Sequence, residues 1–212
     1  MHIKKGLIMQ RRHFIGCGLA SLYGVTVFGQ TFSGTDNKPR CGVASLPNPI
    51  KLFSSKWGKT HLTYYMSSRD TNDMEAEVWD KEFRLAFDAW SEIIPLTFEK
   101  IDNKNKADVL IGVSKRRRSG FGRSGGVLAW AQMPSSRNYD GQLWTMFDLA
   151  ENWVLPDDDG IILRTVACHE IGHLLGLDHS NDKSALMYPY INDALKPRDD
   201  DVKKIQKLYG KK

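Results

Sequence analysis

Residues 169–179 constrain this chain more than any other segment, because they carry three histidines within eleven positions. The segment reads His-Glu-Ile-Gly-His-Leu-Leu-Gly-Leu-Asp-His. His169 and His173 are four residues apart, so on a helix both imidazoles lie on one face. Gly176 is a natural helix terminator, and the turn it allows can bring His179 back toward the same point. The pattern therefore predicts three nitrogen ligands that converge on one metal ion.

The expected metal is a catalytic zinc, because three protein ligands with one open position are typical of such sites. Zinc lowers the pKa of its bound water to about 7 and polarises a substrate carbonyl. Glu170 follows His169 directly and points about 100° around the helix axis. It is therefore placed to hydrogen-bond the metal-bound water, take its proton and pass it to the leaving amine. A binding module that lost its activity is the alternative, and the intact Glu170 argues against it.

Hydrophobic spacing predicts the elements around this motif. Four aromatic residues recur at spacings of four, four and three, which is one face of a helix. They are Trp79, Phe83, Phe87 and Trp90. We expect helices at about 73–94, 162–175 and 198–209, the last with Val202, Ile205 and Leu208 on its buried side. Strands are expected at 61–66, 96–101, 108–113, 127–132 and 143–148. This order predicts an α+β (mixed α/β) domain whose helices pack against one sheet.

The first 29 residues have the composition of an export signal. Basic residues up to Arg11-Arg12 precede a moderately apolar run, 14–28, that carries no charge. The run is too short and too rich in glycine for a membrane span. Gln-Arg-Arg-His-Phe-Ile-Gly at 10–16 resembles a twin-arginine signal, with a general secretory signal as the alternative. We therefore expect cleavage near Gly29, a periplasmic or extracellular location, and no transmembrane segment in the mature chain.

Charge argues against a nucleic-acid partner. The net charge is +5, but four of the 30 basic residues lie in positions 1–29, which contain no acid. From position 30 onward, 26 basic residues face 25 acidic ones. A polyanion-binding surface needs a clustered surplus of charge, so the basic run at 115–118 is interpreted as a solvated loop. We expect protein or peptide substrates, no nucleic acid and a monomer.

Two further motifs resemble parts of known metallopeptidases. Met187 comes eight residues after His179 and precedes Tyr188-Pro189, which resembles the Met-turn of metzincins. Pro-Arg-Cys-Gly-Val at 39–43 resembles the cysteine switch of matrixins. A cysteine thiolate is a good zinc ligand, so Cys41 at the fourth position would exclude water and keep the enzyme latent. A free cysteine in a linker is the alternative.

Together these motifs resemble the matrixin (matrix metalloproteinase-like) family of metzincin zinc endopeptidases, in a bacterial form with a short propeptide. The likeness covers most of 39–210 and includes 57–64, 86–98, 107–111, 125–129 and 200–210. It implies a metzincin catalytic domain with a twisted, mostly parallel sheet and one antiparallel edge strand. An active-site helix, a Met-turn and a C-terminal helix complete that domain. The expected boundaries are a signal peptide at 1–29, a propeptide at 30–52 and a catalytic domain at 53–212.

The resemblance also implies how a substrate binds. The strand around Leu128 and Ala129 would pair with an extended peptide as an added strand. Pro189, Tyr190 and Ile191 would form the opposite wall of the cleft. Thr165, on the zinc helix, would line the pocket for the residue after the scissile bond. The resemblance thus implies endopeptidase activity on extended protein chains.

The chain differs from the family at the positions expected to bind metals other than the catalytic zinc. Matrixins normally carry a second, structural zinc bound by three histidines and one aspartate, and the matching strand positions here are Trp130 and Met146. Of six histidines, two lie in the signal, three at the catalytic zinc, and His61 stands elsewhere, so we expect no second zinc of this type. Asp148 and Glu151 keep the spacing of the family's calcium carboxylates. They are candidate calcium ligands, with solvated turn residues as the alternative.

Overall fold

The computed structural model describes residues 38–43, 55–67, 74–114, 121 and 124–212. All of them belong to one of the chain's two compact units, Phe32–Lys212. Within the described residues the chain forms three α-helices and eight β-strands. The signal expected at 1–29 and the basic run at 115–118 lie outside the described residues.

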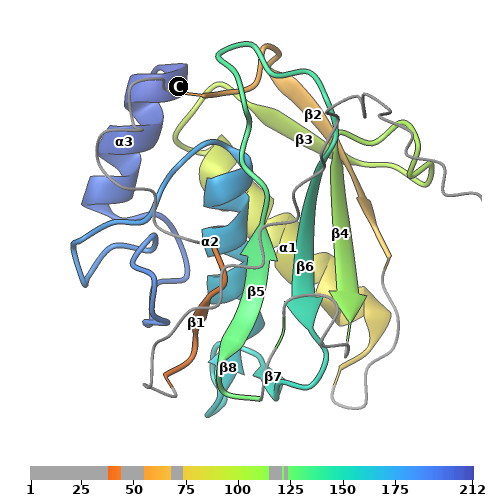
Figure 1. Cartoon of the computed structure of the whole chain (residues 1–212), viewed down its shortest axis with the longest axis vertical. Coiled ribbons are helices and arrows are strands. Elements are labelled where there is room, and N and C mark those ends of the chain that lie inside the picture. The colour runs from red at the N-terminus through yellow and green to blue at the C-terminus, as the bar shows by residue number, and fades with distance from the viewer. Residues whose placement is uncertain (1–37, 44–54, 68–73, 115–120, 122–123) are drawn as a thin grey trace, which may run out of the picture. The chain divides into compact units, whose positions relative to one another are not determined.

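A six-stranded sheet forms the centre of the domain, in the order β1-β5-β6-β4-β2-β3 (Figure 1). Its strands are β1 (Arg40–Cys41), β2 (His61–Met66), β3 (Thr97–Lys100), β4 (Val109–Ser114), β5 (Val127–Ala131) and β6 (Leu143–Asp148). All neighbours are parallel except β5 and β6, which confirms the expected mixed α/β fold. β1 comes from the expected propeptide and covers the outer edge of β5, the antiparallel strand.

Helix α1 (Ala76–Ser91) packs behind the sheet in Figure 1, through the aromatic face that the sequence predicts. Its four aromatic residues are at most 2% exposed. Burying each such side chain stabilises the fold by about 1.5–3 kcal/mol. Phe87 stacks on Tyr64 of β2, with ring centroids 4.4 Å apart, and Phe83 meets Phe147 of β6 edge-on at 5.0 Å. These ring contacts fix α1 against both halves of the sheet.

Helix α2 (Leu163–Leu174) carries the metal motif and packs against α1 and β5. Two polar contacts hold the helices together. The Trp90 indole N–H of α1 donates to the Cys168 carbonyl at 3.0 Å. The guanidinium of Arg164 forms a bidentate pair with the buried carboxylate of Glu82, at 2.7 and 3.0 Å. The direction in which α2 presents its side chains is therefore set by α1.

Helix α3 (Asp199–Tyr209) closes the domain and buries Ile205 completely, with Val202 and Leu208 partly buried. The helices are shorter than expected by up to three residues at an end, because terminal residues of a pattern often serve as caps. A small parallel pair, β7 (Trp153–Val154) and β8 (Ile161–Ile162), was not expected from the sequence.

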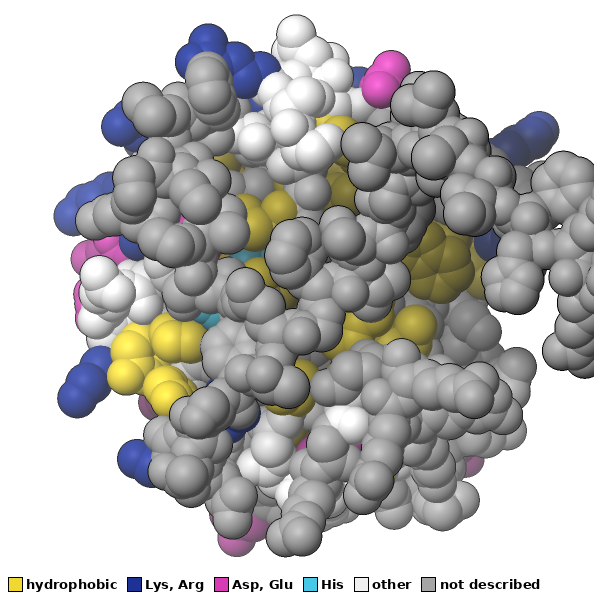
Figure 2. Space-filling view, in the orientation of Figure 1, with side chains coloured by type: hydrophobic (Ala, Val, Ile, Leu, Met, Phe, Trp, Pro, Cys, Tyr) yellow, Lys and Arg dark blue, Asp and Glu magenta, His cyan; other side chains and the backbone are white. Residues whose placement is uncertain are grey.

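The surface of the described residues carries mixed charge. On the face in Figure 2, lysine and arginine side chains lie scattered around the rim, with acidic side chains among them. None of the helices in the described part of the chain is both long and apolar enough to cross a membrane.

Candidate metal centre

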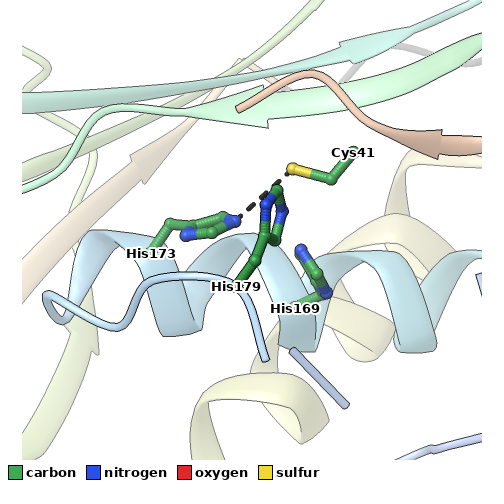
Figure 3. Close-up of side chains that lie close together, drawn as sticks. All are labelled: Cys41, His169, His173 and His179. Carbon is green, nitrogen blue, oxygen red and sulfur yellow. Dashed lines mark hydrogen bonds between the residues drawn. The ribbon is translucent and has the colours of Figure 1, made fainter. Parts of the chain in front are cut away.

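Three histidines converge on one point beside α2 (Figure 3). His169 and His173 project from the helix, and His179 reaches them from the loop that follows. The three ring centroids lie 4.7 to 5.4 Å from one another. Gly176 allows the turn, because its φ of +96° is left-handed and a Cβ there would lie 2.2 Å from the Ser55 carbonyl oxygen. The sequence motif therefore produces the convergence that its spacing predicts.

Backbone carbonyls orient two of the rings. Nδ1 of His169 lies 2.7 Å from the Leu186 oxygen, and Nδ1 of His173 lies 2.7 Å from the Leu177 oxygen. A carbonyl only accepts, so each Nδ1 carries the hydrogen and each Nε2 keeps its lone pair. Burial lowers the pKa of His169 to about 4. Burial, and then the neighbouring histidines, lower the pKa of His173 well below its usual value. Both rings are therefore neutral at pH 7, as metal ligands need to be.

Cys41 faces the histidines from β1 (Figure 3). Its Sγ lies 3.4 Å from Nε2 of His173 and accepts a hydrogen bond from the Val43 N–H at 3.3 Å. Burial raises the pKa of the Cys41 thiol, and the charge of Glu170 adds to this. A cation bound beside the sulfur would lower that pKa instead. The residue as a whole is only partly buried, but its sulfur lies among the three imidazoles.

The donor set fits zinc. One ligand atom from each of Cys41, His169, His173 and His179 lies within 4.8 Å of the others. Nitrogen and sulfur donors in this number are typical of tetrahedral zinc. The Nε2 of His169 is buried and makes no hydrogen bond with any described residue. A buried lone pair without a partner costs free energy, which a bound cation would recover.

Glu170 lies beside this cluster and is fully buried. Neither of its carboxylate oxygens makes a hydrogen bond of good geometry with a described residue, although the Cys41 thiol is close enough to interact with it. Burial raises the pKa of Glu170 to about 8, and the contact with Cys41 partly opposes this. A carboxylate with so high a proton affinity is suited to general acid–base chemistry near neutral pH.

Met187 is fully buried. A Cβ on Gly172 would lie 2.4 Å from the Met187 sulfur, so the turn packs directly against the backbone of α2. Asp201 of α3 holds this turn, because its carboxylate accepts the N–H groups of Leu186 at 2.8 Å and Met187 at 3.1 Å. Asp201 was not predicted from the sequence. An acidic residue in the first turn of a helix is common, because its charge interacts favourably with the helix dipole. It gives no sign of a contact with another segment.

The segment 39–42 lies between two walls and hydrogen-bonds to both. On the β5 side, the N–H groups of Arg40 and Gly42 donate to the carbonyls of Gly126 and Ala129, at 2.9 and 2.7 Å. On the other side, the Cys41 N–H donates to the Pro189 carbonyl at 3.0 Å, and the Ile191 N–H donates to the Pro39 carbonyl at 3.2 Å. The backbone groups at β5 and at 189–191 are therefore spaced to hold an extended chain between them.

A pocket of about 290 Å³, part of it open to solvent, adjoins this segment and the histidines. Four of the five residues expected to bind substrate line it: Leu128, Thr165, Pro189 and Tyr190. The fifth, Ala129, contributes its carbonyl to the neighbouring strand pair. Ile191, expected in the same wall as Pro189 and Tyr190, lines it too, whereas Val166, Leu186, Tyr188 and Asn192 were not foreseen; the remaining lining residues are Arg40, Cys41, His169 and Glu170. The apolar residues among them carry no pattern that distinguishes a pocket wall from the core.

The candidate calcium residues are both buried at 2% exposure. The carboxylate of Glu151 accepts the Gly125 N–H at 2.8 and 2.9 Å and the Ser124 hydroxyl at 3.0 Å. Asp148 accepts the Ala150 N–H at 2.9 Å. Among the described residues, neither belongs to a group of three or more histidine, cysteine or acidic side chains arranged around one point. Glu151 therefore holds the loop that enters β5, and Asp148 holds the turn that follows β6.

Trp130 and Met146 stand at the strand positions that the resemblance associates with a second zinc. Trp130 and Met146 are paired directly across β5 and β6. The end of the Met146 side chain lies 3.0 Å from the Cβ position of Gly112. His61 stands apart on β2, where its Nδ1 lies 2.9 Å from the hydroxyl of Thr97.

Comparisons with known proteins agree with this geometry. The matrixin family model matches residues 56–210. Matrix metalloproteinase-20 of Homo sapiens is 41% identical over 204 residues, which are 91% of this chain and 41% of that protein. Karilysin of Tannerella forsythia is 40% identical over 181 residues, 82% of this chain and 37% of that protein. Matrix metalloproteinase-16 of Rattus norvegicus is 34% identical over 220 residues, 91% and 36% of the two chains. The chain thus spans about two fifths of the length of these curated relatives.

Proposed function

The chain belongs to the matrixin family, and from this membership we propose that it is a zinc-dependent endopeptidase acting on extended protein substrates. The observation that carries the proposal is the convergence of His169, His173 and His179 with the thiol of Cys41. Two of the similar proteins are named matrix metalloproteinases, which agrees with it.

The three histidines would hold the zinc ion. When bound, zinc acidifies a water molecule and polarises a carbonyl oxygen. The histidines bind without first losing a proton, because burial already keeps His169 and His173 neutral. The carbonyls of Leu186 and Leu177 fix the orientation of those rings, so no side-chain rearrangement is required.

Glu170 would act as the general base. It would accept a proton from the attacking water and donate it to the leaving amine. Its burial supports this role, because a desolvated carboxylate binds a proton more tightly than one in water. It also has no strong hydrogen bond to a described residue that would hold it away from the water.

An extended substrate would take the place of residues 39–42. When that segment leaves, the carbonyls of Gly126, Ala129 and Pro189 lose their partners. A peptide backbone laid along β5 would satisfy them, which is a general mode of peptide recognition by sheet edges. The side chain that enters the adjoining pocket would then set the cleavage preference.

Cys41 would keep the enzyme latent by occupying the position at which water must bind. We infer that 1–29 is a signal for export from the cytoplasm, 30–52 a propeptide and 53–212 the catalytic domain. The enzyme would act in the periplasm or outside the cell, as a monomer. Calcium at Asp148 and Glu151 stays a prediction, which a direct calcium titration tests.

The test uses the full-length chain with Cys41→Ala, incubated with a peptide library. We expect cleavage that a chelator abolishes and added zinc restores. In the same background, Glu170→Ala should lower kcat by roughly 10²- to 10⁴-fold, the usual contribution of a general acid–base group. Glu77→Ala, which alters an exposed glutamate on α1, is the matched control and should cleave normally. Cleavage that resists the chelator, or full activity in Glu170→Ala, would overturn the proposal.

A further inference from the structure

Two side chains from distant parts of the chain hold the C-terminal end of α2. The last carbonyl groups of a helix have no partners within it, so they need partners from elsewhere. The indole N–H of Trp57 donates to the Leu174 carbonyl at 2.8 Å, across 117 positions of sequence. The hydroxyl of Tyr209, the last residue of α3, donates to the Leu175 carbonyl at 2.9 Å. The end of α2 is therefore fixed by groups that do not belong to the helix.

Trp57 and Tyr209 are also bonded to each other. The backbone N–H of Trp57 donates to the Tyr209 hydroxyl oxygen at 3.1 Å, so this hydroxyl both accepts and donates. The Trp57 side chain is 2% exposed and meets the ring of Tyr139 edge-on, with centroids 5.1 Å apart. The N–H of the next residue, Gly58, donates to the Tyr139 carbonyl at 2.9 Å. Trp57 is therefore held on its backbone and on its ring.

The segment that carries Trp57 packs directly on the turn that follows α2. A Cβ on Gly176 would lie 2.2 Å from the carbonyl oxygen of Ser55. The ammonium group of Lys56 donates to the Leu208 carbonyl of α3 at 2.8 Å. Residues 55–57 thus join the end of α3 to the end of α2.

This turn leads directly to two of the metal ligands. The N–H groups of Gly176 and Leu177 donate to the carbonyls of His173 and Gly172, both at 2.9 Å. Leu177 supplies the carbonyl that orients the His173 ring. Two residues later the loop presents His179 to the other imidazoles (Figure 3). The position of the turn therefore decides where both of these rings lie.

We propose that Trp57 and Tyr209 are positioning residues for the metal centre. By holding the end of α2 and its turn, they keep His173 and His179 in the arrangement that binds the ion. Removing a group that orients the ligands of a metal commonly lowers metal affinity by about 10- to 100-fold. A site whose ligands are held in place before binding needs such supporting residues. This inference rests on the proposed zinc-dependent function and adds the residues that preorganise its metal site.

The first measurement is zinc affinity, determined by competition with a chromogenic chelator in full-length Cys41→Ala protein. In this background the three histidines hold the ion without the thiol. Trp57→Phe removes the indole N–H and keeps an aromatic side chain, and Tyr209→Phe removes only the hydroxyl. We expect each substitution to weaken zinc binding by about tenfold.

Two control variants lose the same kind of hydrogen bond away from the metal cluster. Trp153→Phe removes an indole that is equally buried and donates to the Asp148 carbonyl at 2.8 Å. Tyr139→Phe removes a hydroxyl that donates to the Gln142 carbonyl at 3.1 Å. Both should lose stability in urea much as the two test variants do, but keep the zinc affinity of the background. Equal zinc affinity in the test and control variants would overturn the proposal, because the pair would then only stabilise the fold.

Amide hydrogen exchange in the metal-free protein separates this inference from the proposed function. We expect the amides of Gly176 and Leu177 to exchange about fivefold faster in Trp57→Phe than in Trp153→Phe, which corresponds to one lost hydrogen bond. A background chain that binds no zinc would contradict the proposed function, and the faster exchange would still support the hold on the turn. Exchange at the turn that is equal in the two variants would overturn the role of Trp57 even in a chain that binds zinc.

Discussion

The sulfur of Cys41 lies 3.4 Å from Nε2 of His173, although 132 positions separate the two residues. The contact depends on β1, a strand of only two residues whose backbone bonds both walls of the cleft. The thiol and the few backbone hydrogen bonds therefore act together to keep the segment in place. Removing the thiol or weakening these backbone hydrogen bonds should let the segment leave the cleft.

Removing the thiol should abolish latency. Cys41→Ala leaves the position beside His173 open to water, so we expect cleavage of a fluorogenic peptide to start without a lag. Cys168→Ala is the control, because that thiol is buried against α1 and lies outside the metal cluster. It should keep the lag of the unaltered chain. A lag of the same length in Cys41→Ala would refute the proposed switch.

Adding one methyl group at Gly42 should weaken the backbone pairing that holds residues 39–42 against β5. A Cβ there would lie 2.6 Å from Cγ1 of Val127 and 3.2 Å from the Ala129 carbonyl oxygen. Gly42→Ala therefore pushes the segment away from β5, and we expect latency to be lost faster in a time course of peptide cleavage. Lys38→Ala, at an exposed position nearby, should change nothing. Latency as durable in Gly42→Ala as in the original chain would contradict the pairing.

Gly172→Ala should destabilise the domain by about 1–3 kcal/mol, the usual cost of overpacking a core. The added Cβ meets the Met187 sulfur at 2.4 Å and the Trp90 ring at 3.0 Å. Urea unfolding measures the effect. Adding Met187→Ala should recover part of the loss, because the clash then has one partner fewer. Strictly additive effects of the two substitutions would show that the turn does not press on α2.

Asp201 and Asp200 are neighbours whose substitutions should differ in cost. Asp201 is fully buried, and its carboxylate accepts the N–H groups of Leu186, Met187 and Arg198. Asp201→Asn should cost about 2–4 kcal/mol, because the buried donors lose charge-assisted bonds. Asp200→Asn, at a partly exposed position, should cost no more than about 1 kcal/mol. Chemical unfolding of both variants decides, and equal losses would argue against the anchoring role of Asp201.

The contribution of Asp200 should depend on pH. Its hydrogen bonds from Lys204 and Ser180 hold the pKa of this carboxyl below its ordinary value. A lowered folded pKa stabilises the fold above the unfolded value of about 3.9, and that stabilisation is lost as pH falls through the folded pKa. The stability difference between the chain and Asp200→Asn should therefore be full at pH 6 and shrink below pH 4. Thermal unfolding across this range tests it, and a difference that grows in acid would be the opposite result.

Local spacing made most of the fold predictable. The aromatic face of α1 and the histidines of α2 can be read directly, because helical periodicity places residues four apart on one side. β1 could not be predicted, since two residues in a Pro- and Ser-rich segment show no alternation and pair only with a strand far along the chain. The Glu82–Arg164 pair and the contacts of Asp201 are equally non-local. Charged residues on a helix carry no signal for the partner that tertiary packing supplies.

Zinc content, measured by mass spectrometry on the purified full-length chain, tests the central claim most directly. We predict one zinc ion per chain, lost in His173→Ala and retained in His61→Ala, whose histidine lies outside the cluster. Two zinc ions would contradict the prediction that the chain lacks a second, structural zinc. A chain that carries no zinc, or zinc that survives His173→Ala undiminished, would contradict the metal centre itself.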